Sequence, residues 1–93
     1  MNYGVYAIKD EMDGTFMQPW MIPKGENEEA RAKRFAAEIA RATEIIKNNS
    51  NDYQLYRLAD FNDRDGYMNL GFDVKKIAGI TEIMNERRKP NGM

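Results

Sequence analysis

Residues 53–60 read YQLYRLAD, and residues 3–10 read YGVYAIKD. Both segments follow the pattern Tyr, x, aliphatic, Tyr, x, aliphatic, x, Asp. Tyrosine and aliphatic residues at this spacing suit a pleated, half-buried β-strand. We therefore predict two similar strands, which arose by duplication or by convergence of two similar hairpins.

Each predicted strand is followed by an Asp-Gly pair, Asp13-Gly14 in the first copy and Asp65-Gly66 in the second. Glycine readily adopts the positive φ of a tight reversal, so each pair indicates a β-hairpin. The first hairpin is expected to pair about residues 2–9 with 15–21, and the second about 52–60 with 67–71. A helical pattern follows each hairpin, which predicts two ββα units.

The first helix is expected to begin after Asn27, which can cap it, with Glu28 and Glu29 in its first turn. Its apolar positions recur with helical period: Ala32, Phe35, Ala36, Ile39, Ala42, Thr43 and Ile46. Such a helix is roughly 30 Å long at 1.5 Å per residue, enough to cross a four-stranded sheet. A weaker helix is expected from Asp73, on the apolar positions Val74, Ile77, Ile80 and Met84, with Gly79 interrupting it.

The predicted fold is therefore α+β, with a roughly four-stranded antiparallel sheet and one long amphipathic helix packed on a face. Residues 1–86 are expected to form a single domain, and residues 87–93 a flexible basic tail. The 93 residues are 42% hydrophobic and 31% charged, as in a soluble globular protein. No segment approaches the roughly 20 apolar residues of a membrane span, and no signal peptide is expected.

Cysteine and histidine are both missing from the sequence. Their absence excludes disulfides, thiolate metal sites and the nucleophilic triads that depend on histidine or cysteine. Residues 60–66 read DFNDRDG, but aligning Gly66 with the glycine of a calcium loop places Phe61 and Phe72 where carboxylates are required. The other acids lie in solvated turns, so we expect no enzyme activity, metal or cofactor.

Alternation along the strands separates two faces of the sheet. We assign Tyr6, Ile8, Tyr56 and Leu58 to one face, and Tyr3, Val5, Ala7, Tyr53, Leu55 and Arg57 to the other. If the second face is open, its tyrosines and arginine could stack nucleobases, as in several single-strand binders. Alternatively, the tyrosines pack the sheet or a subunit interface, which favours a homo-oligomer.

Two other groups of residues are candidates for binding. Trp20 and Met21 near Pro19 form either an adaptable binding surface or core filling. Basic residues gather on the first helix, at Lys75 and Lys76, and in the tail as Arg87, Arg88 and Lys89. The tail is the best candidate for contacts with a phosphate backbone, although a solubilising role is equally compatible with it.

Residues 52–61, DYQLYRLADF, followed by an acidic turn and Gly66, resemble the core pattern of the small nonstructural protein of gokushovirus-type microviruses, which are single-stranded DNA phages. The opening segment with its turn at Gly14 is similar to the start of that family, and the resemblance covers roughly residues 2–80. It implies a protein that binds DNA or aids the switch from genome replication to packaging. The chain departs from the pattern at Ala59, where a glycine is expected, and in its longer basic C-terminus.

The leading hypothesis is thus a phage nonstructural protein that binds single-stranded DNA in the host cytoplasm as a homo-oligomer. Its expected binding residues are Tyr3, Tyr53, Arg57, Arg87, Arg88 and Lys89. The alternative is a non-enzymatic adaptor that contacts a capsid or host replication protein through the same face or through Trp20 and Met21.

Overall fold

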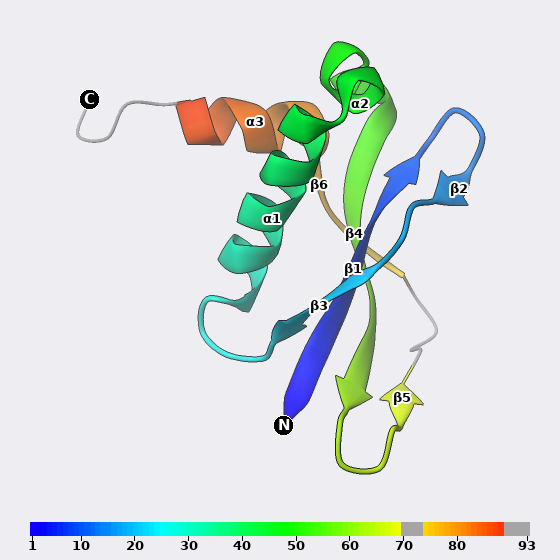
Figure 1. Ribbon diagram of the computed structural model, residues 1–93, viewed down its shortest axis with the longest axis vertical. Coiled ribbons are helices and arrows are strands. Elements are labelled where there is room, and N and C mark those ends of the chain that lie inside the picture. Colours follow the sequence, from blue (N-terminus) through cyan, green and yellow to red (C-terminus); the bar gives the residue numbers. More distant parts are fainter. Residues whose placement is uncertain (70–73, 89–93) are drawn as a thin grey trace.

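The computed structural model describes residues 1–69 and 74–88, which form an antiparallel six-stranded sheet and three α-helices (Figure 1). In chain order, the elements are β1 (Asn2–Asp10), β2 (Thr15–Phe16), β3 (Trp20–Pro23), α1 (Glu28–Ala42), α2 (Glu44–Asn48), a 3₁₀ turn (Ser50–Asp52), β4 (Tyr53–Asn62), β5 (Met68–Asn69), β6 (Lys75–Gly79) and α3 (Ile80–Arg88). The predicted α+β class is confirmed.

Strands β1 and β4 pair along their whole length in the middle of the sheet. Strands β2 and β3 pair with the two halves of β1, and β5 and β6 pair with the two halves of β4. The sheet has six strands rather than the predicted four or so because both outer strands are interrupted. The two predicted ββα units are therefore matched only loosely.

The predicted Asp-Gly hairpin turns are confirmed. Gly14 has φ 76° and Gly66 has φ 69°, and each donates its N–H to the carbonyl of the residue four positions earlier. After the first turn, Met17 donates one hydrogen bond to the Ile8 carbonyl at 2.8 Å, and pairing then stops until Trp20. Pro19 lies in this gap, where its missing N–H deprives the ladder of a donor.

Helix α1 is shorter than predicted, because Thr43 is extended (φ −116°, ψ 107°) and separates it from α2. Asn27 precedes the helix as expected, but its side chain makes no cap hydrogen bond. The buried positions of α1 are alanines: Ala32, Ala36, Ala37 and Ala40. Phe35, predicted to be part of the apolar stripe, is 42% exposed. Small side chains at the contact allow the helix to lie close to its neighbours.

The second predicted helix is wrong in its first half. Lys75–Gly79 forms strand β6, which pairs with the N-terminal half of β4, and the helix begins only at Ile80. Hydrogen bonding to the free edge of β4 outweighs the weak local helical pattern, as tertiary context commonly does. Ile80 and Ile83 of α3 are buried, while the predicted cap Asp73 lies outside the described residues.

The assignment of β4 side chains to the two faces is also wrong. In the β1–β4 ladder, Ile8 lies opposite Leu55 and Asp10 opposite Tyr53, and cross-strand partners share a face. Tyr53 and Leu55 thus lie on the same face as Ile8, where they join the core against the helices. Tyr56 lies opposite Ala7 on the other face.

A β-bulge explains why the repeat misled this assignment. Val5 pairs with Ala59 and Tyr6 with Arg57, so Leu58 is an extra residue in β4. A shift of one residue moves side chains to the opposite face of a sheet. Equivalent tyrosines of the two copies, such as Tyr3 and Tyr53, consequently lie on opposite faces.

Candidate nucleic-acid interface

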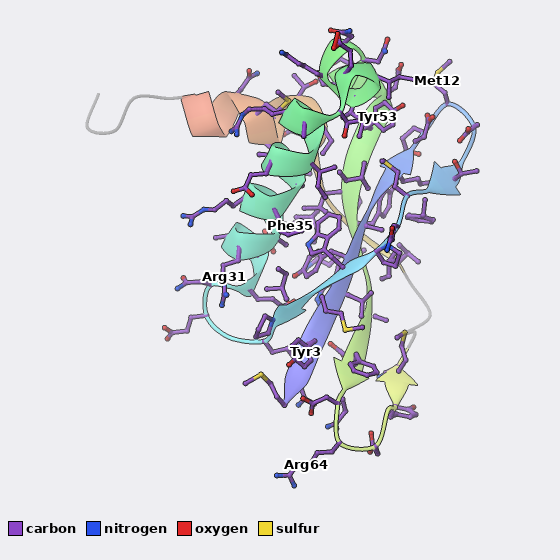
Figure 2. The ribbon with its side chains drawn as sticks, viewed as in Figure 1. Tyr3, Met12, Arg31, Phe35, Tyr53 and Arg64 are labelled. Atoms are coloured by element: carbon purple, nitrogen blue, oxygen red, sulfur yellow. The ribbon has the colours of Figure 1, made fainter. Side chains whose placement is uncertain are left out.

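One face of the sheet carries no described helix. Helices α1 and α3 lie beside the sheet (Figures 1 and 2). They contribute to a core that contains Tyr6, Ile8 and Leu55 from the other face. The cross-strand partners on the helix-free side define what we call the open face: Tyr3, Val5, Ala7, Lys9, Phe16, Met21, Tyr56, Ala59, Phe61, Met68 and Lys76.

Aromatic side chains form a pair near each end of the open face. The rings of Tyr3 and Phe61 have centroids 6.3 Å apart, and those of Phe16 and Tyr56 are 5.5 Å apart in an edge-on arrangement. Both pairs include a residue from β4, one of the two central strands. The open face therefore carries two separate aromatic platforms, in which Phe16 is exposed and the other three rings are half-buried.

The residues between the two ring pairs have small side chains and are buried. Val5, Ala7 and Ala59 are each at most 5% exposed, although none belongs to the helix-side core. Their neighbours Met21 and Met68 are 45% and 40% exposed. The small side chains at the centre of the open face are therefore buried, and the two methionines beside them are exposed.

Lys9 holds a positive charge over one of the aromatic platforms. Its Nζ lies 5.4 Å from the Phe16 ring centroid and 5.5 Å from that of Tyr56, within the range of a cation–π contact. Glu11 is 3.6 Å from the same ammonium and accepts a hydrogen bond of 2.6 Å from the Tyr56 hydroxyl. That hydrogen bond, with Lys9, lowers the pKa of Glu11.

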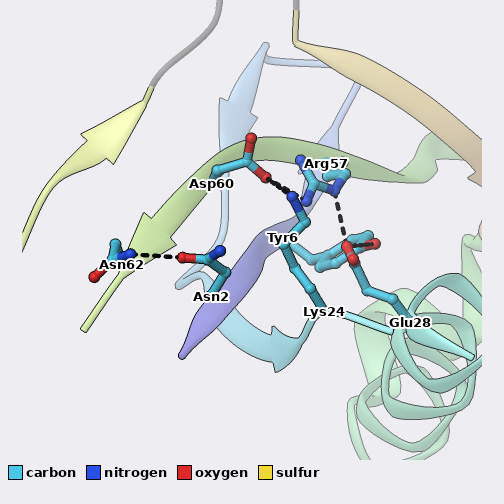
Figure 3. A network of polar contacts seen from close by, with 7 residues as sticks. All are labelled: Asn2, Tyr6, Lys24, Glu28, Arg57, Asp60 and Asn62. Carbon is cyan, nitrogen blue, oxygen red and sulfur yellow. Dashed lines mark hydrogen bonds and ion pairs between the residues drawn. The ribbon is translucent and has the colours of Figure 1, made fainter. Parts of the chain in front are cut away.

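The predicted site residue Arg57 lies on the helix side of the sheet and is engaged in ion pairs (Figure 3). Its Nε donates to Glu28 Oε2 at 2.8 Å, and its Nη2 donates to Asp60 Oδ1 at 2.6 Å. Burial opposes the charged form of Arg57, but the hydrogen bonds to Glu28 and Asp60 raise its pKa overall. A guanidinium held in this way fixes the structure and is not displayed on the open face.

Glu28 joins the first turn of α1 to the sheet. Its Oε2 also accepts a hydrogen bond of 2.5 Å from the hydroxyl of Tyr6, which is 1% exposed. Burial, together with the hydrogen bond to Glu28, raises the pKa of Tyr6. The carboxylate thus receives two donors from the two central strands.

The predicted binding residues are not brought together. Tyr3 lies on the open face. Tyr53 is 7% exposed and belongs to the core, and Arg57 lies on the helix side of the sheet. Arg87 and Arg88 belong to α3, and Lys89 lies outside the described residues. Their placement corrects the predicted geometry, while their role in binding remains a prediction.

Sequence reasoning missed Lys9, Phe16, Tyr56 and Phe61 as members of the open face. The available signal was the Asp-Gly turn, which sets Phe16 close to Lys9 in the first hairpin. Strict alternation along β4 places Tyr56 on the face opposite to Phe61, but the bulge at Leu58 brings both onto the open face.

Within residues 1–69 and 74–88, no cluster of acidic side chains has the geometry to hold a metal ion. No helix in the same part of the chain is both long and apolar enough to cross a bilayer.

Comparison with known proteins identifies the family. The sequence profile of a family described as the phage ORF5 protein matches residues 3–83, from the start of β1 into α3. The chain belongs to the phage ORF5 protein family. The match spans every residue of the open face as well as the Glu28–Arg57 ion pair. It confirms that this is a phage protein, as the resemblance implied, and leaves the microvirus type as a proposal.

No curated protein and no solved structure matches the chain.

Proposed function

We propose that this phage ORF5-family protein binds single-stranded DNA across its open face. The observation that carries the proposal is the pair of aromatic platforms, Tyr3 with Phe61 and Phe16 with Tyr56. Bases stack on exposed aromatic rings in single-strand binders, at about 1–3 kcal/mol per base. Duplex DNA offers no free base faces to such rings, so the proposal commits to single strands.

Lysines next to the rings supply the contacts to phosphate. Lys9 lies over the Phe16–Tyr56 platform, and Lys76 pairs opposite Tyr56 from β6. The chain has a net charge of −1, so long-range attraction to DNA is weak. Stacking therefore supplies more of the affinity than phosphate contacts do, and the salt dependence is shallow.

The family supports a phage setting, and the resemblance supplies the rest of this proposal. In a microvirus-type phage, the ligand is the single-stranded genome in the host cytoplasm, and the protein aids the change from replication to packaging. Arg87, Arg88 and Lys89 add phosphate contacts beyond the open face in this proposal. Homo-oligomerisation extends the binding surface along the strand.

The test is a fluorescence anisotropy titration with a labelled single strand at about 50 mM and then about 200 mM salt, with duplex as the control. The proposal expects micromolar or tighter binding of the single strand, modest weakening with salt and weaker binding of the duplex. Equal affinity for duplex and single strand would contradict stacking as its basis.

A second candidate is the adaptor function, in which a capsid or host replication protein covers the open face. The observation that favours it is the exposure of Met21 and Met68, because methionine surfaces adapt to protein partners. The same titration separates the two functions, since an adaptor shows no DNA affinity at either salt concentration. Pull-down of partners at both salt concentrations would then follow.

A further inference from the structure

One side of α1 carries a stripe of four exposed residues. Arg31, Phe35, Glu38 and Ala42 follow one another at helical spacing, so they lie on the same side of the helix. All four are exposed, whereas the buried alanines of α1 lie on its other sides. The stripe is therefore the outward surface of α1.

An apolar patch surrounds Phe35, the aromatic member of this stripe. Its side chain is 42% exposed, although its ring stacks on Trp20 at a centroid distance of 5.0 Å. Together with Met17, Pro19 and Ile39, Phe35 lines a hollow of about 290 Å³ between α1 and the link from β2 to β3. Met17 and Pro19 are exposed, and Ile39 is half-buried. An exposed apolar patch with charged side chains at its rim is typical of a protein–protein contact.

Opposite charges flank Phe35 along the stripe. Arg31 lies about one helical turn before Phe35, and Glu38 lies about one turn after it. Both side chains are exposed, and neither forms an ion pair with another residue in the described part of the chain. The stripe therefore has a positive and a negative charge, with an apolar centre between them.

Such a surface is complementary to a second copy of itself. When two α1 helices cross in opposite directions at Phe35, Arg31 of each chain faces Glu38 of the other, and the two apolar patches meet between these pairs. A crossing in the same direction instead places like charges opposite each other, which is unfavourable. A contact in which both chains use the same patch is the usual interface of a two-fold dimer.

We propose that the chain forms a two-fold dimer through α1, with the apolar patch at its centre and two Arg31–Glu38 ion pairs between the chains. This interface rests on the proposed function only for the expectation of a homo-oligomer, since no DNA enters the contact. Helix α1 lies on the side of the sheet opposite to the open face, so both open faces stay uncovered in the dimer. Two open faces on one particle strengthen binding to a strand that is long enough to reach both.

The first test is sedimentation equilibrium of the full chain without DNA, over about 10 µM to 1 mM protein, the range expected for a small interface. A monomer–dimer equilibrium is expected. A chain that is monomeric at every concentration overturns the dimer and leaves the apolar patch to a different protein partner.

Charge reversal tests the geometry of the interface. Arg31→Glu and Glu38→Arg each place like charges opposite each other at both ion pairs, so each variant is expected to dimerise at least about tenfold more weakly than the wild type. An equimolar mixture of the two variants is expected to form a heterodimer, because one chain then carries two negative charges and the other two positive charges. A misfolded variant would not regain association on mixing, so the mixture distinguishes a broken interface from a broken fold.

Arg64→Glu is the matched control for Arg31→Glu. Arg64 is exposed in the turn between β4 and β5, at the end of the sheet away from α1 (Figure 2). Its reversal changes the net charge by the same amount and should leave dimerisation at the wild-type level. Equal weakening by the two variants, or a mixture that forms no heterodimer, overturns the α1 interface.

The outcomes separate the dimer from the proposed function. Single-strand binding by a chain that stays monomeric overturns the dimer and leaves the DNA function intact. A dimer that binds no DNA supports the α1 interface and overturns the proposed function.

Discussion

The backbone of Gly4 lies against the carboxylate of Glu28, so closely that a Cβ on Gly4 would overlap with Glu28 Oε2. The same Cβ would lie 2.9 Å from Nη2 of Arg57. Glycine inside a strand commonly marks the close approach of another group, and here that group is an ion pair between α1 and β4. Gly4 provides the space in which the helix is fixed to the sheet.

Gly4→Ala should therefore displace Glu28 from Arg57 and Tyr6, with a loss of about 1–3 kcal/mol of unfolding free energy, as for other overpacked sites. The measurement is urea unfolding followed by Trp20 fluorescence. Gly25→Ala is the control, because a Cβ on Gly25 meets nothing within 4 Å, and its effect should stay within about 0.5 kcal/mol. Equal effects of the two substitutions would contradict the assigned role of Gly4.

The cost of Gly4→Ala should depend on the side chain at position 28. In a Glu28→Ala background, the carboxylate is absent and the methyl group of Gly4→Ala has more space. A double-mutant cycle is expected to give a coupling of about 0.5–3 kcal/mol between the two positions, the usual range for residues in contact. Additive effects would show that Gly4 and Glu28 act independently.

Asp60 should contribute to acid sensitivity. The hydrogen bond from Arg57, opposed by partial burial and aided by Lys24, lowers the pKa of Asp60 below its ordinary 3.8. A lowered folded-state pKa gives stability that is present above the unfolded value and is lost as the pH falls through the folded value. Asp60→Asn should therefore be less stable at neutral pH and lose less stability below about pH 4.

Asp65→Asn is the control for this pH series, since Asp65 accepts a backbone N–H in the second hairpin turn and makes no contact with Arg57. The unfolding curves of both variants are compared with the wild type over the same pH series. If Asp60→Asn and the wild type lost the same unfolding free energy as the pH falls, the Arg57–Asp60 ion pair would not contribute to acid sensitivity.

The two tyrosines of β4 should behave in opposite ways. Tyr53→Ala removes a side chain that is 7% exposed and should cost about 3–5 kcal/mol of stability, like other buried aromatic truncations. Tyr56→Ala alters the open face, so it should weaken single-strand binding by about 1–3 kcal/mol with a smaller loss of stability. Unfolding and anisotropy measurements on both variants check these two expectations. If Tyr53→Ala folds and weakens DNA binding while Tyr56→Ala does not, Tyr53 is the binding residue, as the sequence predicted.

Lys9 should set part of the salt dependence of DNA binding. Lys9→Gln removes one phosphate contact and is expected to reduce the slope of log affinity against log salt by about 1. Lys33→Gln is the matched control, because Lys33 lies on α1 and pairs with Glu29 away from the open face. An unchanged slope for Lys9→Gln would remove Lys9 from the interface.

The sequence correctly predicted the elements that depend on local signals, namely turn glycines and apolar periodicity. The Asp-Gly turns were found because Gly14 and Gly66 need positive φ, and α1 was found because its apolar period is strong. Strand β6 was mistaken for helix because its stability comes from pairing with β4, which no local pattern reveals.

The faces of β4 were misassigned for a related reason. A bulge changes which side chains of a strand point to which face, and no particular residue type marks it. Leu58 in the sequence therefore did not indicate the bulge in β4. The role of Arg57 was also missed, although one signal was present: Gly4 in a strand otherwise rich in large side chains indicates that something lies against it.

The pairing of β1 with β4 has a consequence for synthesis. The ribosome makes Asn2–Asp10 before its central partner, which ends only at Asn62, so the ladder between them cannot close until β4 has emerged. Contacts between residues so distant in sequence slow folding. Until they pair, the exposed edges of the strands promote association between chains. Codon changes that slow translation after residue 23 should therefore lengthen the exposure of the first hairpin and lower the yield of folded protein in the cell.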